Sequence, residues 1–266
     1  MENMIPRVIH YCWFGGNPLP ESAKKCIASW KKFFPGYEIK EWNETNYDVK
    51  KIPYISQAYE SKKYAFVSDY ARFDILYHEG GIYFDTDVEV LKSFDDILKN
   101  GAFMGCEIDA ALPLKTEQIY STNKNYGMVN PGLGIAASPG LHIYREILDF
   151  YNIQSFLNLD GSLNTETVVT KTTNVLKQHG FKDIKGIQQI EGITIYPKEY
   201  FNPKDSKTGR IIITENTHSI HWYAMTWLSP GKRLRKKILD PFHQILGPSC
   251  FRWIRKIFSG YKESDI

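Results

Sequence analysis

The opening of the chain alternates between strand and helix, and this alternation limits the possible folds more than any other feature. Residues 7–12 (RVIHYC) have the composition of a buried strand. Residues 21–34 carry apolar side chains at helical spacing, and residues 37–42 (YEIKEW) alternate as strands do. A strand, a helix and a second strand of these lengths form a βαβ unit, which predicts an α/β fold with parallel strands. Further strands are predicted over residues 101–106 and 133–137, and further helices over residues 141–156 and 165–179.

The composition agrees with this fold class and excludes several others. Of the 266 residues, 42% are hydrophobic and 24% are charged, which excludes a disordered or fibrous chain. No segment approaches the roughly 18 uninterrupted apolar residues of a membrane-spanning helix. The N-terminal residues lack a secretory signal pattern, and the four cysteines are scattered, which fits reduced thiols. We therefore expect a soluble, cytoplasmic protein.

An acidic triplet follows the next predicted strand. A helix is predicted over residues 63–78, and the apolar residues 82–84 form a buried strand that ends at Asp85-Thr86-Asp87. In open α/β sheets, ligands bind at the carboxyl edge of the strands. Two carboxylates in this pattern can bind Mg²⁺ or Mn²⁺, and the ion can neutralise a diphosphate leaving group. An exposed acidic loop without a ligand is the alternative.

The predicted helix over residues 63–78 carries a charged pair. Asp69 and Arg72 are three residues apart and therefore share one helix face. A surface ion pair is one interpretation. The same face carries Phe66 and Phe73, which indicates partial burial, and a partly buried charged pair near a sheet edge is suited to binding polar hydroxyls.

Three blocks of the sequence resemble a known family. Residues 68–87 (SDYARFDILYHEGGIYFDTD) closely resemble the DXD sugar-binding region of glycosyltransferase family 32, which contains retaining mannosyl-, galactosyl- and N-acetylhexosaminyl-transferases and is related to glucosylating toxin domains. Residues 5–15 (IPRVIHYCWFG) look like the family's opening strand, and residues 217–227 (THSIHWYAMTW) look like its closing His/Trp segment. The resemblance implies a GT-A-type fold, a Rossmann-like mixed sheet flanked by helices, over residues 1–229.

The resemblance also implies roles for the matching residues of the largest block. Asp85 and Asp87 would hold the metal ion and, through it, the donor diphosphate. Asp69 and Arg72 would bind hydroxyls of the donor sugar. These four are the predicted catalytic residues, and Ser68 joins them in the predicted nucleotide-sugar site.

Aromatic and imidazole side chains of the two outer blocks would complete the donor site. Trp13 would lie against the nucleotide base, with an ordinary half-buried aromatic residue as the alternative, and Trp227 would close over the diphosphate. His221 would complete the metal site, and an imidazole beside oxygen ligands favours Mn²⁺ over Mg²⁺. His218 competes with His221 for that role, and the sequence does not decide between them.

The sequence thus predicts a metal-dependent, retaining glycosyltransferase. It would move a hexosyl unit from a UDP- or GDP-linked donor to a hydroxyl of a glycan or lipid-linked oligosaccharide, in the synthesis of a surface polysaccharide such as capsule or lipopolysaccharide. On the acceptor side, Asn130 belongs to a predicted turn, and Glu166 is a candidate carboxylate whose alternatives are helix capping and solvation.

Two other functions are kept as alternatives. The strand that ends in the acidic triplet also resembles the nucleophile motif of haloacid-dehalogenase-like phosphotransferases. In such an enzyme Asp85 would be phosphorylated and Asp87 would act as the acid and base. A catalytically idle protein that binds sugar nucleotides or glycans is the second alternative.

The C-terminal residues 230–266 are strongly basic. From Gly231 to Lys262 nine lysines and arginines accompany a single acidic residue, Asp240, and apolar residues recur at helical spacing. This pattern predicts a basic amphipathic helical appendage that docks on an anionic membrane, at the inner face of the cell membrane. Packing on the protein itself is the alternative. Nucleic acid is not expected as a partner, because no stacking motif accompanies the charge.

We expect the full chain to bind anionic liposomes and a chain that ends at Ser229 to lose this binding. Each Lys or Arg near an anionic surface contributes roughly 1 kcal/mol. Cosedimentation with anionic vesicles measures the effect, and neutral phosphatidylcholine vesicles are the control. Equal binding of the two chains to anionic vesicles would contradict the membrane hypothesis.

Overall fold

The fold is known from a computed structural model that describes residues 4–110, 127–205 and 209–224. The chain divides into two compact units, and the fold and site below belong to the first, which comprises residues 1–203 and 213–222. The predicted domain boundary and the basic appendage lie outside the described residues.

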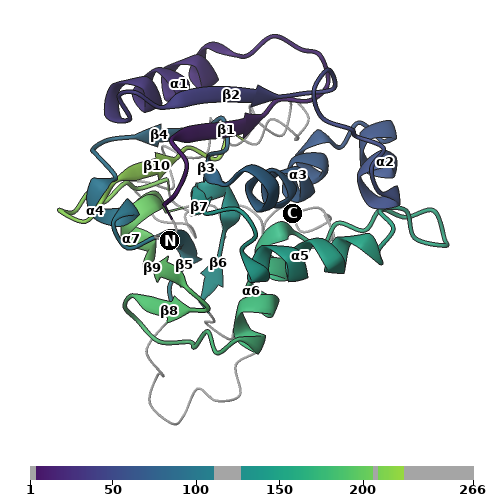
Figure 1. Cartoon of the computed structure of the whole chain (residues 1–266). Coiled ribbons are helices and arrows are strands. Elements are labelled where there is room, and N and C mark those ends of the chain that lie inside the picture. Colours follow the sequence, from purple (N-terminus) through teal and green to yellow (C-terminus); the bar gives the residue numbers. More distant parts are fainter. Residues whose placement is uncertain (1–3, 111–126, 206–208, 225–266) are drawn as a thin grey trace, which may run out of the picture. The chain divides into compact units, whose positions relative to one another are not determined.

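A mixed sheet forms the centre of this unit, with its main path in the order β2-β1-β3-β7-β5-β9-β8 and β6 paired to β5 (Figure 1). Strand β1 runs parallel to both β2 and β3, which confirms the predicted βαβ unit. Strand β7 lies between β3 and β5 and runs antiparallel to both of them, so the sheet is mixed. The strands of the sheet are β1 (Val8–Cys12), β2 (Glu38–Trp42), β3 (Gly81–Tyr83), β5 (Ala102–Ile108), β6 (Met128–Val129), β7 (Ile135–Ala137), β8 (Gln188–Ile190) and β9 (Ile193–Tyr196).

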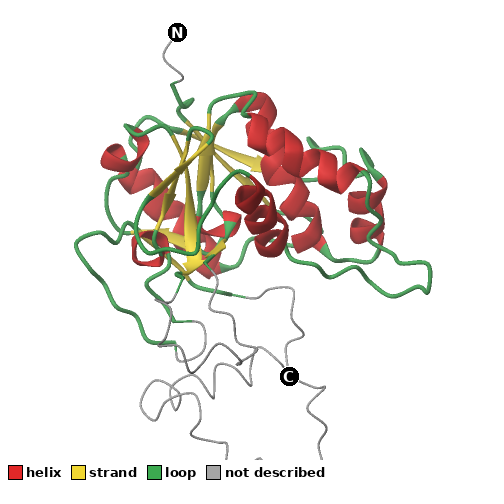
Figure 2. Cartoon of the chain, turned by 90° about the horizontal axis from the view of Figure 1, so that it is seen from below, coloured by secondary structure: helices red, strands yellow, loops and turns green. Residues whose placement is uncertain are grey.

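Helices lie on both sides of the sheet (Figure 2). Alternate residues of each strand point to opposite faces, so Cys12 belongs to the core beneath α2, α3, α5 and α6, whereas Tyr11 belongs to the core beneath α1, α4 and α7. This arrangement confirms the predicted α/β fold class. The helices are α1 (Glu21–Phe33), α2 (Pro53–Glu60), α3 (Tyr64–Glu79), α4 (Asp95–Leu98), α5 (His142–Asn152), α6 (Val168–Gln178) and α7 (Lys198–Phe201), with a 3₁₀ turn η2 (Pro131–Leu133).

A separate antiparallel pair of strands joins distant parts of the chain. Strand β4 (Val88–Val90) begins directly after the acidic triplet, and it pairs with β10 (Ser219–His221). In this register His221 lies opposite Val88. The pairing therefore brings a late segment of the sequence next to Asp85 and Asp87.

The local sequence explains where helix α3, which carries Asp69 and Arg72, ends. Helix α3 is one residue offset from the predicted range, and it ends at Gly80, whose φ of 66° suits glycine at a helix C-terminus.

None of the described helices is both long enough and apolar enough to cross a membrane. Within the described residues, Cys12, Cys26 and Cys106 are buried and form no disulfide.

A neutral histidine lies buried between β1, β2 and the end of α3. The Nδ1 atom of His10 accepts a hydrogen bond from the indole N–H of Trp42 at 3.0 Å, and its Nε2 atom lies 3.0 Å from the carbonyl oxygen of Gly80. Because the indole can only donate, the proton of the neutral imidazole belongs on Nε2, which donates to Gly80. Burial lowers the pKa of His10 to about 4.

We predict that His10 makes the protein less stable as the pH falls from 6.5 to 4. In this window the unfolded chain binds a proton on His10 and the folded chain does not, so the free energy of unfolding decreases by about 3 kcal/mol in total. Urea denaturation of the wild type and of His10→Gln at pH 7 and pH 4.5 measures this. The difference in stability between the two proteins should be smaller at pH 4.5, and an equal difference at both pH values would contradict the assignment.

Candidate active site

The acidic triplet and β10 together form a candidate metal site. The Nε2 atom of His221 lies 3.1 Å from Oδ1 of Asp87 and 4.0 Å from Oδ2 of Asp85. One possible ligand atom from each of the three residues lies within 4.8 Å of the others, and among the described residues no other group of His, Cys, Asp and Glu side chains meets this condition. Two carboxylates and one imidazole fit a divalent cation such as Mn²⁺.

The structure decides which histidine belongs to this group. Residues three apart on a strand point to opposite faces, so His218 and His221 cannot both face the acidic triplet. The Nε2 atom of His218 lies 2.9 Å from Oδ1 of Asp96, and its ring stacks on Tyr200. His218 is therefore part of the packing beneath β10, and His221 is the candidate metal ligand.

Arg72 links the metal site to the charged pair on α3. Its Nη2 atom lies 2.9 Å from Oδ1 of Asp69 and 3.3 Å from Oδ1 of Asp85, and its Nε–H donates to the carbonyl oxygen of Ser68 at 3.1 Å. The side chain of Arg72 is only 4% exposed. The pair of Asp69 and Arg72 is thus a buried bridge rather than a surface ion pair, and Tyr83 supports it by donating its hydroxyl to Asp85 at 3.1 Å.

Burial and mutual repulsion shift the titration of these groups. Burial raises the pKa of Asp69 to about 6, although the charge of Arg72 opposes the shift. Burial also raises the pKa of Asp85, again against Arg72 and with a further contribution from Asp87. For His221, burial alone would lower the pKa, but the carboxylates of Asp87 and Asp85 outweigh it and raise the pKa. A positive charge brought to this site would therefore be well placed.

A backbone turn holds Asp85 from the opposite side. Gly132, in η2, lies so close that a Cβ atom there would come 2.3 Å from Oδ2 of Asp85. Asn130 fixes this turn, because its Oδ1 accepts the N–H of Gly132 at 2.7 Å and its Nδ2 donates to Glu107 at 2.9 Å. Asn130 thus supports the turn that packs against Asp85, and its predicted place on the acceptor side stays a prediction.

The other predicted site residues occupy several places. Trp13 follows β1 at the same sheet edge as Asp85, is partly exposed, and donates its indole N–H to the carbonyl oxygen of Asn17 at 2.6 Å. Ser68 contributes its carbonyl to Arg72, as described above. Glu166 precedes α6 and forms an ion pair with Lys171 at 2.8 Å. Trp227 lies outside the described residues.

Several supporting residues escaped the sequence analysis. Gly132 and Glu107 act through contacts with residues distant in sequence, and no local pattern marks them. Tyr83 is only two residues from its partner Asp85, but the strand pattern does not predict this hydrogen bond. Lys171 lies on the core-facing side of α6, where a lysine is unusual, and this misplaced charge is the one signal that could have been noticed.

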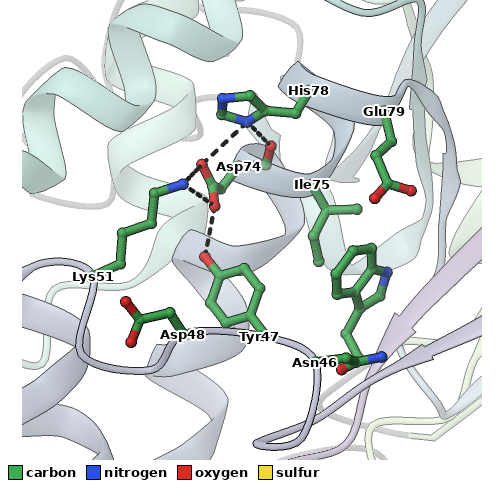
Figure 3. Close-up of a pocket in the computed structure, with 9 residues that line it drawn as sticks. Asn46, Tyr47, Asp48, Lys51, Asp74, Ile75, His78 and Glu79 are labelled. Atoms are coloured by element: carbon green, nitrogen blue, oxygen red, sulfur yellow. Dashed lines mark hydrogen bonds and ion pairs between the residues drawn. The ribbon is translucent and has the colours of Figure 1, made fainter.

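A surface pocket of about 340 Å³ lies beside another part of α3 and is lined by Trp42, Asp74 and residues of the loop after β2. Figure 3 shows that the buried carboxylate of Asp74 is already paired: Lys51 Nζ lies 2.7 Å from each oxygen, and Tyr47 donates its hydroxyl at 2.9 Å. His78 adds a contact at 3.4 Å. The cluster therefore anchors the loop on α3 and leaves no carboxylate oxygen of Asp74 for a ligand.

Comparisons with known proteins agree with this site. Residues 20–104 match the family described as "Glycosyltransferase sugar-binding region containing DXD motif". Inositol phosphoceramide mannosyltransferase 1 of Schizosaccharomyces pombe is 32% identical over 111 residues, which are 38% of this chain and 33% of the relative. The uncharacterized glycosyltransferase L373 of Acanthamoeba polyphaga mimivirus is 31% identical over 109 residues, 38% of this chain and 42% of the relative. The chain thus matches about a third to two fifths of the length of these relatives.

Two solved structures are also similar. The PaToxG glycosyltransferase shares 20% identity with a TM-score of 0.42, over 65% of this chain and 69% of that chain. The galactosyltransferase LgtC, solved with donor and acceptor sugar analogues, shares 12% identity with a TM-score of 0.43, over 88% of this chain and 95% of that chain.

The region that matches this family contains most of the candidate site. Residues 20–104 match the family's sugar-binding region, and they include Asp69, Arg72, Asp85 and Asp87. The resemblance seen in the sequence is confirmed by this match.

We predict that Gly132→Ala weakens Mn²⁺ binding by about 10- to 100-fold, the range found when the support of a metal ligand is disturbed. The new Cβ atom would collide with Asp85 and displace it from His221 and Asp87. Isothermal titration calorimetry with MnCl₂ measures the change.

Gly127→Ala is the matched control for this substitution. Gly127 likewise lies outside the positive-φ region, and a Cβ atom there would meet the edge of the Phe181 ring at 3.3 Å and the backbone nitrogen of Ala110 at an ordinary 3.6 Å. Its Mn²⁺ affinity should equal that of the wild type. Unchanged Mn²⁺ affinity in Gly132→Ala would show that Asp85 is not a ligand in this geometry.

Proposed function

We propose that the chain is a metal-dependent, retaining hexosyltransferase that uses a UDP- or GDP-linked donor and transfers its sugar to a hydroxyl of a glycan or lipid-linked oligosaccharide. The observation that carries this proposal is the continuous row from His221 through Asp87 and Asp85 to Arg72 and Asp69. All of these residues except His221 belong to the matched sugar-binding region. One end of the row suits a diphosphate with its metal ion, and the other end suits the hydroxyls of a sugar.

Each residue has a distinct task in this proposal. Asp85, Asp87 and His221 would hold Mn²⁺ or Mg²⁺, which when bound supplies positive charge at the leaving diphosphate. Arg72 keeps its charge at every relevant pH and donates N–H groups, and Asp69 accepts hydrogen bonds from sugar hydroxyls. Because both side chains are buried and tied to each other, they hold the donor sugar in one orientation.

Retention at the anomeric carbon is supported by the family resemblance. The common retaining route uses two carboxyl groups about 5 Å apart, one of them as a nucleophile. We propose instead that departure of the diphosphate and attack by the acceptor hydroxyl occur on the same face of the sugar. The carboxylates of the row then act on the metal ion and the hydroxyls rather than as nucleophiles.

The acceptor and the cellular setting form the least constrained part of the proposal. The name of the Schizosaccharomyces pombe relative includes inositol phosphoceramide and a mannosyl group, which supports testing GDP-mannose and lipid-borne acceptors first. The basic residues 230–266 support the proposal that the protein binds the inner face of the cell membrane and acts there in the synthesis of a surface polysaccharide. The family match supports transfer of sugar over the phosphotransferase alternative.

We predict that the protein with Mn²⁺ slowly hydrolyses one donor from a panel of UDP- and GDP-linked hexoses, with water as the acceptor. Asp87→Ala should lower the release of nucleoside diphosphate by roughly 100-fold or more, since the charge at the leaving group is then no longer balanced. A coupled assay of nucleoside diphosphate measures both rates.

Omission of the metal and addition of EDTA are the controls for this assay. Hydrolysis that persists in Asp87→Ala would contradict the proposed role of the metal site. Release of phosphate from simple phosphoesters, without any donor hydrolysis, would favour the phosphotransferase alternative. Donor binding without turnover would favour the idle binding protein.

A further inference from the structure

Helix α6 places a lysine where its pattern calls for a core residue. The buried residues of this helix include Val168, Lys171, Thr172 and Val175, at the spacing of one helix face. The side chain of Lys171 is 1% exposed. A buried ammonium is costly unless it is paired and hydrogen-bonded, so its surroundings must compensate the charge.

Lys171 is compensated by polar and aromatic groups from three elements. Its Nζ donates to Oε1 of Gln154 at 2.7 Å and to Oε2 of Glu166 at 2.8 Å. The ammonium also lies 5.3–5.7 Å from the ring centres of Tyr54, Phe150 and Tyr151. Aromatic rings at such distances attract a cation. The ammonium is therefore held in one position, and it holds Glu166 in turn.

This cluster lies beside α3, which carries the sugar-binding end of the row described above. The ring centre of Tyr151 is 5.3 Å from Nζ of Lys171 and 5.8 Å from the ring centre of Tyr70, the residue that follows Asp69. The charge of Lys171 acts on Asp69, where it opposes the effect of burial on the pKa. Tyr54 and Tyr151 are influenced by the carboxylates of both Asp69 and Glu166. The ion pair of Lys171 and Glu166 therefore lies close enough to the Asp69 end of the row to act on its charge.

Hydrogen-bonding capacity remains unused in this cluster. Lys171 binds Oε2 of Glu166, and no hydrogen bond from the described residues reaches Oε1 of the same carboxylate. The side chain of Glu166 is 36% exposed, so a ligand can reach it. The hydroxyls of Tyr54 and Tyr151 are buried and have no hydrogen-bond partner among the described residues. Buried polar groups without partners are rare in folded proteins and require an explanation.

We propose that Lys171 is a positioning residue that fixes one oxygen of Glu166, so that the other oxygen accepts a hydrogen bond from a hydroxyl of the transferred sugar. The inference rests on the proposed function and adds a second carboxylate to the sugar site beside Asp69. It also moves Glu166 from the acceptor side, where the sequence put it, to the donor sugar. The ligand is the hexosyl group of a nucleotide sugar.

A purely structural role for Lys171 makes a different prediction. If the ion pair only tied the segment before α6 to the helix, its loss would affect the nucleoside diphosphate and the nucleotide sugar equally. In the proposed role, only the sugar loses a contact. The informative quantity is therefore the ratio of the two dissociation constants, nucleotide sugar over nucleoside diphosphate, for one protein.

Lys171→Met and Glu166→Gln test the proposal by calorimetry with Mn²⁺. The probes are UDP and GDP and the matching UDP-glucose, UDP-galactose, UDP-N-acetylglucosamine and GDP-mannose. Methionine keeps the approximate length and the apolar stem of Lys171 but removes its charge. Glu166→Gln removes the charge of the partly exposed partner and keeps an oxygen that can accept the hydrogen bond from Lys171. We expect each variant to raise the ratio about tenfold, as for the loss of one hydrogen bond to a charged group.

Lys177→Met is the matched control. Lys177 lies on the same helix, and its ion pair with Asp183 at 3.2 Å is partly exposed, so the same chemical change there should leave the ratio unchanged. If Lys171→Met does not fold, as judged by circular dichroism, Glu166→Gln carries the test.

The outcomes separate this inference from the proposed function. A wild type that binds both kinds of probe, with an unchanged ratio in Glu166→Gln and in folded Lys171→Met, would overturn the inference alone. An equal loss of affinity for both kinds of probe would also overturn it, in favour of a structural role. A wild type that binds neither kind of probe would overturn the proposed function and the inference together.

Discussion

The buried guanidinium of Arg72 is the interaction on which the site depends. It is nearly inaccessible to water, and it is compensated by Asp69 at 2.9 Å and Asp85 at 3.3 Å. Removal of one partner from such a group would leave an uncompensated buried charge, which costs several kcal/mol. Arg72 therefore ties the orientation of α3 to the end of β3. The same contact fixes a carboxylate of the metal site and a carboxylate of the sugar site in one geometry.

Strand geometry supplies the second constraint. The two carboxylates of the acidic triplet form a candidate metal site only together with a residue from elsewhere in the chain, and the pairing of β4 with β10 brings His221 to them. His221 ends β10 and His218 directly precedes this strand. Because successive residues of an extended chain point to opposite sides, only one of the two histidines can face the candidate metal site. His221 meets Asp87, and His218 is used in packing against Tyr200 and Asp96. Two similar residues thus have different tasks because of a single geometric rule.

Sequence patterns predict the parts of this protein that depend on local order. The βαβ unit, the range of α3 and the acidic triplet after β3 all follow from periodicity and glycine positions. The choice of His221 over His218, the approach of Gly132 to Asp85 and the burial of Lys171 depend on contacts between distant segments, for which one sequence contains no pattern. Asn130 illustrates the difference. The turn that contains it was predicted from the sequence, but its hydrogen bond to Gly132, which packs against Asp85, was not.

Charge balance connects the metal site to the sugar site. Four carboxylates (Asp69, Asp85, Asp87 and Glu166) accompany two basic side chains, Arg72 and Lys171, so in formal charge, with a neutral His221, the cluster retains two negative charges. Burial raises the pKa of Asp69 and Asp85 despite their cationic neighbours, and the neighbouring carboxylates add to both shifts. One divalent cation balances the two negative charges. Under the proposed function a donor diphosphate would add further negative charge to an already negative site, so the donor binds only after, or together with, the metal ion.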